Sequence, residues 1–181
     1  MGFFSKIFYT PPPREEWSEI ALNISKSVES VSEIWFAEAV QTLKENSLEV
    51  KNTTLDGDGK LALRAYLLYL SAVFTASNEY IARADGKDFG DILFAYVCGN
   101  EIEEVLKFFS RYFDADGGEL ISRFSGDISS YILEEQSAFA LLFLAPSTVK
   151  LGLMIDVDIA KYFGDKSTSD EMYQKLQNFS S

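Results

Sequence analysis

The sequence has no histidine and a single cysteine, Cys98, among its 181 residues. Without histidine there is no imidazole general base, no Ser–His or Cys–His nucleophile pair and no histidine metal ligand. One cysteine excludes an intrachain disulfide and a thiolate zinc cluster. Because Cys98 follows the apolar run 92–97, we expect it to be a packed thiol in a reducing compartment.

Glycine-rich phosphate-binding and dinucleotide-binding motifs are absent, and so is the Gly-x-Ser-x-Gly nucleophile elbow. A helical di-iron site needs Glu-x-x-His pairs, which a chain without histidine does not provide. An enzyme that uses carboxylates alone stays open, but no sequence feature selects a pair of them. We therefore expect a protein that is not an enzyme and needs no metal and no cofactor.

Basic residues are scarce. Lysine and arginine number 16 against 28 aspartates and glutamates, so the formal net charge is −12. A surface this acidic argues against direct nucleic-acid binding, which needs cationic side chains to neutralise phosphates. The chain is 47% hydrophobic and 24% charged, which is the composition of an ordinary globular protein rather than a disordered one.

Prolines are also few, and three of the four stand together at positions 11–13. They form a stiff spacer after a short apolar start that does not resemble a secretory signal. We expect an N-terminal segment over 1–13, a single all-helical domain over 14–181 and a cytoplasmic location. The apolar runs 65–76 and 137–145 are too short to span a bilayer, so we expect no stable membrane insertion.

Apolar residues recur with a helical period nearly everywhere, and no stretch shows sustained apolar–polar alternation. The fold class we predict is all-α, with about seven to nine helices and essentially no β structure. The first helix either bends near 30–32 or continues to Asn46, and the helix over 61–84 is apolar almost all round, as in the centre of a bundle. The other expected helices are 89–98, 120–124, 127–144 closed by Pro146, 147–163 and one from Ser169 or Asp170 to Phe179.

Another helix is predicted to start after Gly99, with Asn100 and Glu103 as a capping box. It carries one apolar face, formed by Ile102, Val105, Leu106, Phe109 and Phe113. Aromatic residues at such a spacing most often belong to the core, and otherwise to a ligand pocket or a groove for a partner.

Two segments share the pattern Asp-x-Asp-Gly: 56–59 and 114–117. The pattern suggests a calcium loop, but the first and twelfth positions of an EF-hand fall on Thr54 and Ala65, and on Tyr112 and Arg123. We expect turns that end one helix and use an aspartate to cap the next.

Charge is unevenly distributed along the chain. The segment 88–145 carries eleven acids and three bases, which is two thirds of the excess in about one third of the chain. These acids fall mostly at predicted helix starts and turns, where they would be exposed, and an acidic patch accelerates association with basic partners. The candidate partner-binding residues are Asp88, Asp91, Glu101, Glu103, Glu104, Asp114, Asp116, Glu119, Asp127, Glu134 and Glu135.

This profile is typical of a small cytoplasmic bacterial immunity protein, an inhibitor that neutralises a basic, nuclease-type toxin by occluding its cationic cleft. Mimicry of nucleic acid is a variant of the same hypothesis, although the net charge is only about half that of a duplex of similar length. The alternative is a helical module that binds a small ligand or a lipid in an aromatic-lined cavity, with an acidic surface that serves solubility alone. Oligomeric state is left open.

Overall fold

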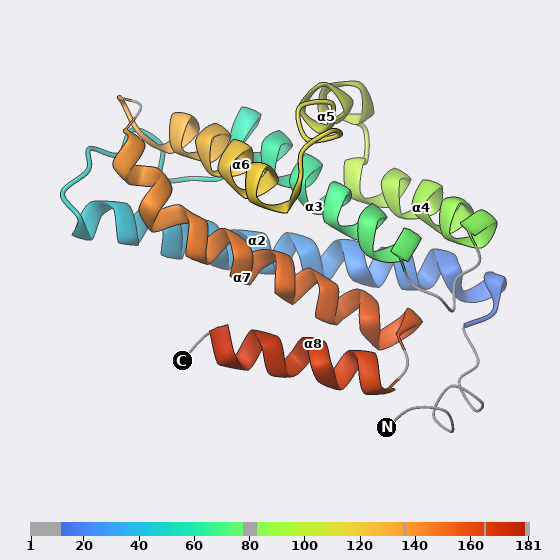
Figure 1. The fold of residues 1–181 in the computed structure, drawn as a ribbon. Coiled ribbons are helices and arrows are strands. Elements are labelled where there is room, and N and C mark those ends of the chain that lie inside the picture. Colours follow the sequence, from blue (N-terminus) through green and yellow to red (C-terminus); the bar gives the residue numbers. More distant parts are fainter. Residues whose placement is uncertain (1–11, 78–82, 136, 165, 180–181) are drawn as a thin grey trace.

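The computed structural model describes residues 12–77, 83–135, 137–164 and 166–179. Within them it contains seven α-helices and no strand apart from an isolated bridge between Val50 and Leu133, so the all-α prediction is confirmed. The elements are η1 Arg14–Glu16, α2 Trp17–Glu45, α3 Gly57–Ser77, α4 Arg83–Cys98, α5 Ile102–Phe109, α6 Gly117–Ile132, α7 Ala138–Phe163 and α8 Lys166–Phe179 (Figure 1).

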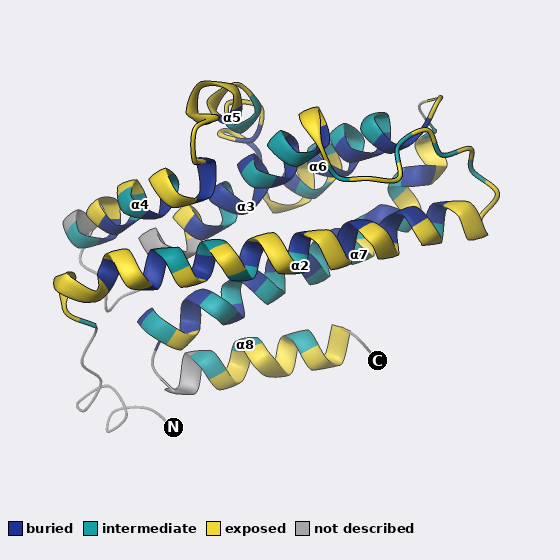
Figure 2. Cartoon of the chain, turned by 180° about the vertical axis from the view of Figure 1, so that it is seen from behind, coloured by how far each residue is buried: buried dark blue, intermediate teal, exposed yellow. Residues whose placement is uncertain are grey.

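Helix α3 is the centre of the bundle, as its apolar circumference predicts. It packs against α4, α5, α6 and α7, while α2 packs against α4 and α7. Helix α8 lies along α7, and in both views it occupies the edge of the molecule opposite α5 (Figures 1 and 2). The body of the bundle therefore separates α5 from α8 (Figures 1 and 2).

The first helix shows why a period of 3.6 residues is a good guide here. Helix α2 is continuous over 29 residues, without the bend that was one of the two expectations. Its buried residues include Trp17, Ile24, Trp35 and Leu43, which all lie on one face, and the opposite face is exposed along its whole length (Figure 2). Burial of each such side chain contributes about 1.5–3 kcal/mol, which outweighs the weak local preference for a break at the serines.

Aromatic side chains fill the core in two groups. Tyr66 of α3 stacks on Phe124 of α6 with ring centroids 4.0 Å apart. At the other end, Phe89 packs against Trp17 at 5.9 Å and against Phe163 at 4.4 Å. Because edge-to-face and stacked pairs add about 0.5–1.5 kcal/mol beyond their area, these contacts join α2, α3, α4, α6 and α7.

The expected break at Pro146 is wrong, because α7 runs from Ala138 to Phe163 with the proline inside it. Proline removes the hydrogen bond to the carbonyl of Leu142, which lies on the exposed side of the helix where water can replace it. The buried stripe continues across the proline through Leu144, Thr148 and Leu151, so packing holds both halves in one line.

Further predicted helix boundaries are wrong. The helix expected over 127–144 is divided in the structure, because α6 ends at Ile132 and α7 begins at Ala138. The expected interruption near Gly126 is absent, since α6 is continuous to Ile132, and Asp127 lies within it instead of capping a new helix. The helix predicted over 61–84 was expected to end at residue 84, but residues 83–86, with Asp85 and Gly86 among them, form the first turn of α4. Gly86 is buried there, and the acidic Asp85 suits a helix N-terminus and pairs with Arg14.

Helix α7 is also the one described helix long and apolar enough to cross a membrane by length and composition. In this structure it packs against α2, α3, α6 and α8 and carries Asp156, Asp158 and Lys161 near its end. The uninterrupted helix explains why the sequence pattern, which divided it at Pro146, did not indicate a span of this length.

Candidate functional site: the α4–α5–α6 side

All eleven predicted acids lie on α4, α5 and α6 or on the turns beside them, which form the side of the molecule opposite α8 (Figure 1). Ten of them are exposed, and Asp127 is half-buried. Prediction from the sequence thus selected one side of the fold. The structure then divides these acids into two groups with different surroundings.

Five of the eleven are paired with arginines of this chain. Each pairing joins a predicted site residue to a cation that a partner's lysine or arginine would have to displace. The pairs are Asp88 with Arg14 at 3.1 Å, Glu101 with Arg64, Asp114 with Arg123 at 2.9 Å, Glu119 with Arg123, and Asp127 with Arg111 at 2.9 Å.

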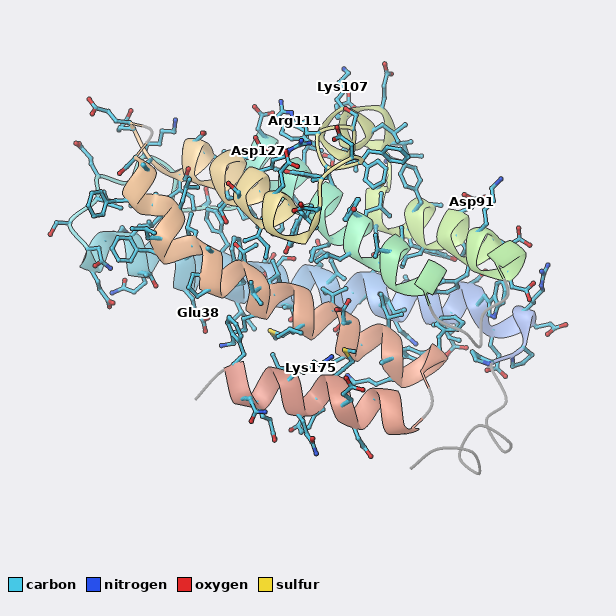
Figure 3. The ribbon with its side chains drawn as sticks, viewed as in Figure 1. Glu38, Asp91, Lys107, Arg111, Asp127 and Lys175 are labelled. Atoms are coloured by element: carbon cyan, nitrogen blue, oxygen red, sulfur yellow. The ribbon has the colours of Figure 1, made fainter. Side chains whose placement is uncertain are left out.

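Asp127 joins α6 to the turn that follows α5. Its second carboxylate oxygen accepts a hydrogen bond of 2.8 Å from the hydroxyl of Tyr112, which is fully buried. Burial, and then the negative charge of Asp127, raise the pKa of Tyr112, so the phenol stays a hydrogen-bond donor. Figure 3 shows Arg111 and Asp127 side by side between the two helices. Asp127 therefore links α6 to the turn after α5, and its carboxylate is already paired within the chain instead of being available to a partner.

The guanidinium of Arg123 stabilises the turn between α5 and α6. It donates to Asp114 and Glu119 and to the backbone carbonyl of Arg111. The hydrogen bond from Arg123 lowers the pKa of Asp114 below its ordinary value. Asp116 accepts a 3.0 Å hydrogen bond from the backbone N–H of Glu119 as the cap of α6, so the capping role predicted for the second Asp-x-Asp-Gly segment is confirmed.

The first Asp-x-Asp-Gly segment leads into α3 and contacts α6. The hydroxyl of Tyr131 lies within hydrogen-bonding distance of the Asp56 carboxylate and, at 2.9 Å, of the Thr54 carbonyl, and its single proton is donated to one of the two. Gly57 has a φ of 49° and begins α3, in the left-handed region that favours glycine. Among the residues described, no three potential acidic or thiol ligands come together as a metal site.

Six predicted acids make no ion pair with another described residue. One is Asp116, the cap of α6, and the other five are Asp91, Glu103, Glu104, Glu134 and Glu135. These five stand in three groups along this side of the fold. Asp91 projects from α4, the pair Glu103 and Glu104 starts α5, and Glu134 and Glu135 follow α6 at its far end (Figures 1 and 3). The structure does not gather the eleven acids into one cluster, and α5 carries the pair in the middle.

Helix α5 departs most from the sequence prediction. Its expected apolar face is divided, because Val105 is buried while Ile102, Leu106 and Phe113 are 41%, 46% and 74% exposed. The expected capping box is also absent, since Glu101 occupies the N-cap position and its carboxylate turns to Arg64. One signal in the sequence was overlooked: apolar residues over 102–113 cover a wider arc than one neighbouring helix can bury.

Two grooves, of about 500 and 410 Å³, border the α4–α5–α6 side, and Arg111 and Asp127 line both of them. Other spaces lie away from this side. A pocket of about 110 Å³ between α2, α3 and α4 is lined by polar side chains such as Ser25, Ser32 and Arg64. A larger apolar groove of about 560 Å³ runs between α6, α7 and the end of α8, and is lined by Leu141, Leu142, Pro146, Val149 and Phe179 among others. The largest described aromatic rings fill the core instead of lining either space.

Cys98 is fully buried at the end of α4, and burial raises the pKa of its thiol to about 11. A thiol in that environment remains protonated near neutral pH and packs as a small apolar side chain. This agrees with the packing role predicted from the apolar run that precedes it.

No protein-family model matches this chain, and searches of curated proteins and of solved structures found no match either.

Proposed function

We propose that this chain is a binding protein for a basic protein partner, and that it serves as a bacterial cytoplasmic inhibitor of the immunity type. The partner is a nuclease-type toxin whose cationic cleft it occludes. One observation carries the proposal: in a molecule of net charge −12, the α4–α5–α6 side presents exposed carboxylates that no described cation of the chain neutralises. Long-range attraction of this kind accelerates association with cationic partners.

The contact would centre on Glu103 and Glu104. Both are exposed in the first turn of α5, two and three residues after Glu101, which is paired with Arg64. In the complex, the free carboxylates would pair with lysines and arginines that otherwise hold phosphates. The five acids that are paired with arginines of this chain are already neutralised. We therefore propose that they stabilise the fold and do not contact the partner.

The composition supports binding over catalysis. The chain lacks histidine, and the pKa of its one thiol is raised by burial. Burial also raises the pKa values of Tyr66 and Tyr112, which keeps both phenols protonated. These side chains are therefore poorly suited to act as a nucleophile or a general base at neutral pH.

The proposal is tested by the rate of association with the basic protein encoded beside this chain, measured by stopped-flow fluorescence at several salt concentrations. The double variant E103K/E104K should associate about tenfold more slowly than wild type at low salt, because steering falls with the charge. The control E38K reverses an exposed charge on α2 and should change the rate much less (Figure 3). No binding by the wild type, or equal rates for all three proteins, would contradict the proposal.

A second candidate function is favoured by the apolar groove between α6, α7 and α8. Leu141, Leu142 and Val149 line it, and its volume suits an acyl chain or a small apolar ligand. Here the acidic surface would serve solubility alone. Native mass spectrometry of the purified protein would show a bound apolar molecule, and release of that molecule from the variant L142D would assign it to this groove.

A further inference from the structure

Helix α5 presents an apolar stripe to solvent. Ile102, Leu106, Phe109 and Phe113 follow one another at intervals of four, three and four residues, which places them along one line of a helix and of the turn that continues it. Val105 and Tyr112 point instead into the core, where both are fully buried. Phe109 is half-buried against the core, whereas Ile102, Leu106 and Phe113 are exposed, so the bundle covers this second apolar face only in part.

The neighbouring helix α3 extends this surface. The ring of Tyr69 lies 6.1 Å from that of Phe109, and its hydroxyl donates to the carbonyl of Ala115 at 3.3 Å. Val73 lies one helical turn after Tyr69 and is 48% exposed. We call this surface the α5 patch; it consists of Tyr69, Val73, Ile102, Leu106, Phe109 and Phe113.

The α5 patch is held in place from both ends. At the start of α5, Glu101 is paired with Arg64 of α3. At its end, Tyr112 is hydrogen-bonded to Asp127 of α6, and the ring of Phe109 packs against that of Phe113 at 6.2 Å. A surface that is already ordered loses little conformational entropy on binding, and this favours its use as a docking site.

The acidic residues beside the α5 patch limit the kinds of partner that can bind to it. Glu103 and Glu104 lie on the same short helix, and Asp114 and Asp116 follow Phe113. A second copy of this chain would bring the same carboxylates and another −12 charges to the contact, which like-charge repulsion disfavours. An anionic membrane surface is disfavoured for the same reason.

We propose that the α5 patch docks an amphipathic segment of a cationic protein, with an apolar row that covers Leu106 and Phe113 and flanking lysines or arginines that reach Glu103 and Glu104. The inference rests on the proposed function and adds the chemistry of the partner's contacting segment. Exposed aromatic and aliphatic side chains at the centre of a contact, with charges at its rim, are the arrangement from which most binding energy arises.

The test uses a fluorescein-labelled 18-residue peptide of leucine and lysine in a helical period as the probe, with fluorescence anisotropy as the readout. A peptide of the same composition in scrambled order has the same charge but no apolar face. The double variant L106S/F113S removes the stripe. Its matched control is I34S/F139S, which removes one side chain of α2 and one of α7 that are 60% and 66% exposed. All four positions are exposed, and thermal unfolding followed by circular dichroism verifies that both variants fold.

We expect the amphipathic peptide to bind wild type, and L106S/F113S to weaken its binding about tenfold or more, while I34S/F139S stays within about twofold. The scrambled peptide should bind at least about tenfold more weakly than the amphipathic one. In nitrogen-15 correlation spectra, the peptide should shift the amides of 102–113 and of Tyr69 and Val73.

Other outcomes overturn the inference in distinguishable ways. If both peptides bind equally and L106S/F113S binds like wild type, attraction is by charge alone; the proposed function then stands and the docking patch does not. If the I34S/F139S control loses binding instead, the contact lies on α2 or α7. If neither cationic peptide binds, the proposed function fails as well. A dimer in sedimentation equilibrium that L106S/F113S abolishes would make the patch a contact between two copies.

Discussion

At the residue scale, Asp156 is the carboxylate whose surroundings differ most from water. It lies within the apolar helix α7, near Tyr66 of α3 and Lys175 of α8. Burial raises its pKa to about 6, while the positive charge of Lys175 lowers it slightly. Figure 3 shows Lys175 between α8 and α7. The ionised form is therefore less favourable in the folded protein than in the unfolded chain.

The sign of the pH dependence follows from that shift. Because the pKa is higher in the folded state, the stability linked to Asp156 is fully present below its ordinary pKa of 3.8 and is lost as the pH rises through about 6. We predict that D156N is more stable than wild type by about 2 kcal/mol at pH 7.5, since the amide carries no charge into this site. The advantage should shrink as the pH falls to 4.5.

Urea unfolding of both proteins between pH 4.5 and 8 measures this difference directly. D170N is the matched control, because Asp170 is exposed on α8. A difference between D156N and wild type that stays constant over the whole pH range would show that the carboxylate does not titrate there.

At the scale of the elements, the start of α3 depends on a glycine for a steric reason. A Cβ at position 59 would lie 2.4–2.8 Å from three ring atoms of Tyr131. That ring cannot move freely, because its hydroxyl is hydrogen-bonded to Thr54 and Asp56. The close approach of α3 to α6 therefore requires glycine at this position.

We predict that G59A lowers the free energy of unfolding by about 1–3 kcal/mol, the range found for overpacked contacts. The control G126A places a Cβ within α6 with no heavy atom within 4 Å, so it should raise stability by about 0.5–1 kcal/mol through helix propensity. Urea denaturation monitored by tryptophan fluorescence compares the two. Equal effects of the same sign would refute the assigned role of the Tyr131 ring.

At the scale of the whole molecule, the bundle has a stable centre and a lightly attached edge. Helix α3 is buried among four neighbours, whereas α8 packs chiefly on α7 and has exposed residues over most of its length (Figure 2). Of the described α8 side chains, those of Ser169, Met172 and Leu176 are half-buried and the others are exposed. Local opening is easiest where few apolar contacts hold an element.

We predict that the backbone amides of α8 exchange with deuterium at least about a hundredfold faster than those at the centre of α3, a ratio set by the free energies of opening. Hydrogen exchange followed by mass spectrometry at neutral pH measures both helices in one experiment. Protection of α8 as strong as that of α3 would show that the two unfold together.

Much of the helical arrangement follows from local pattern. Periodicity, glycine conformation and capping act over a few residues, so the sequence pattern predicted four features correctly. They are the buried stripe of α2, the central position of α3, the helix end at Gly99 and the capping by Asp116. The predicted helix breaks at Pro146 and Gly126 are absent from the structure, because packing over several turns outweighs the local preference of one residue.

The sequence by itself determined the all-helical class, the acidic charge and the set of chemistries that a chain without histidine lacks, since these depend on composition and short-range pattern. Only the tertiary structure decided which acids are tied to arginines and which apolar face of α5 remains in solvent. An ion pair such as Arg64 with Glu101 joins residues far apart in the chain, and an apolar stripe is buried only where another element covers it. Both depend on distances in space that no local pattern contains.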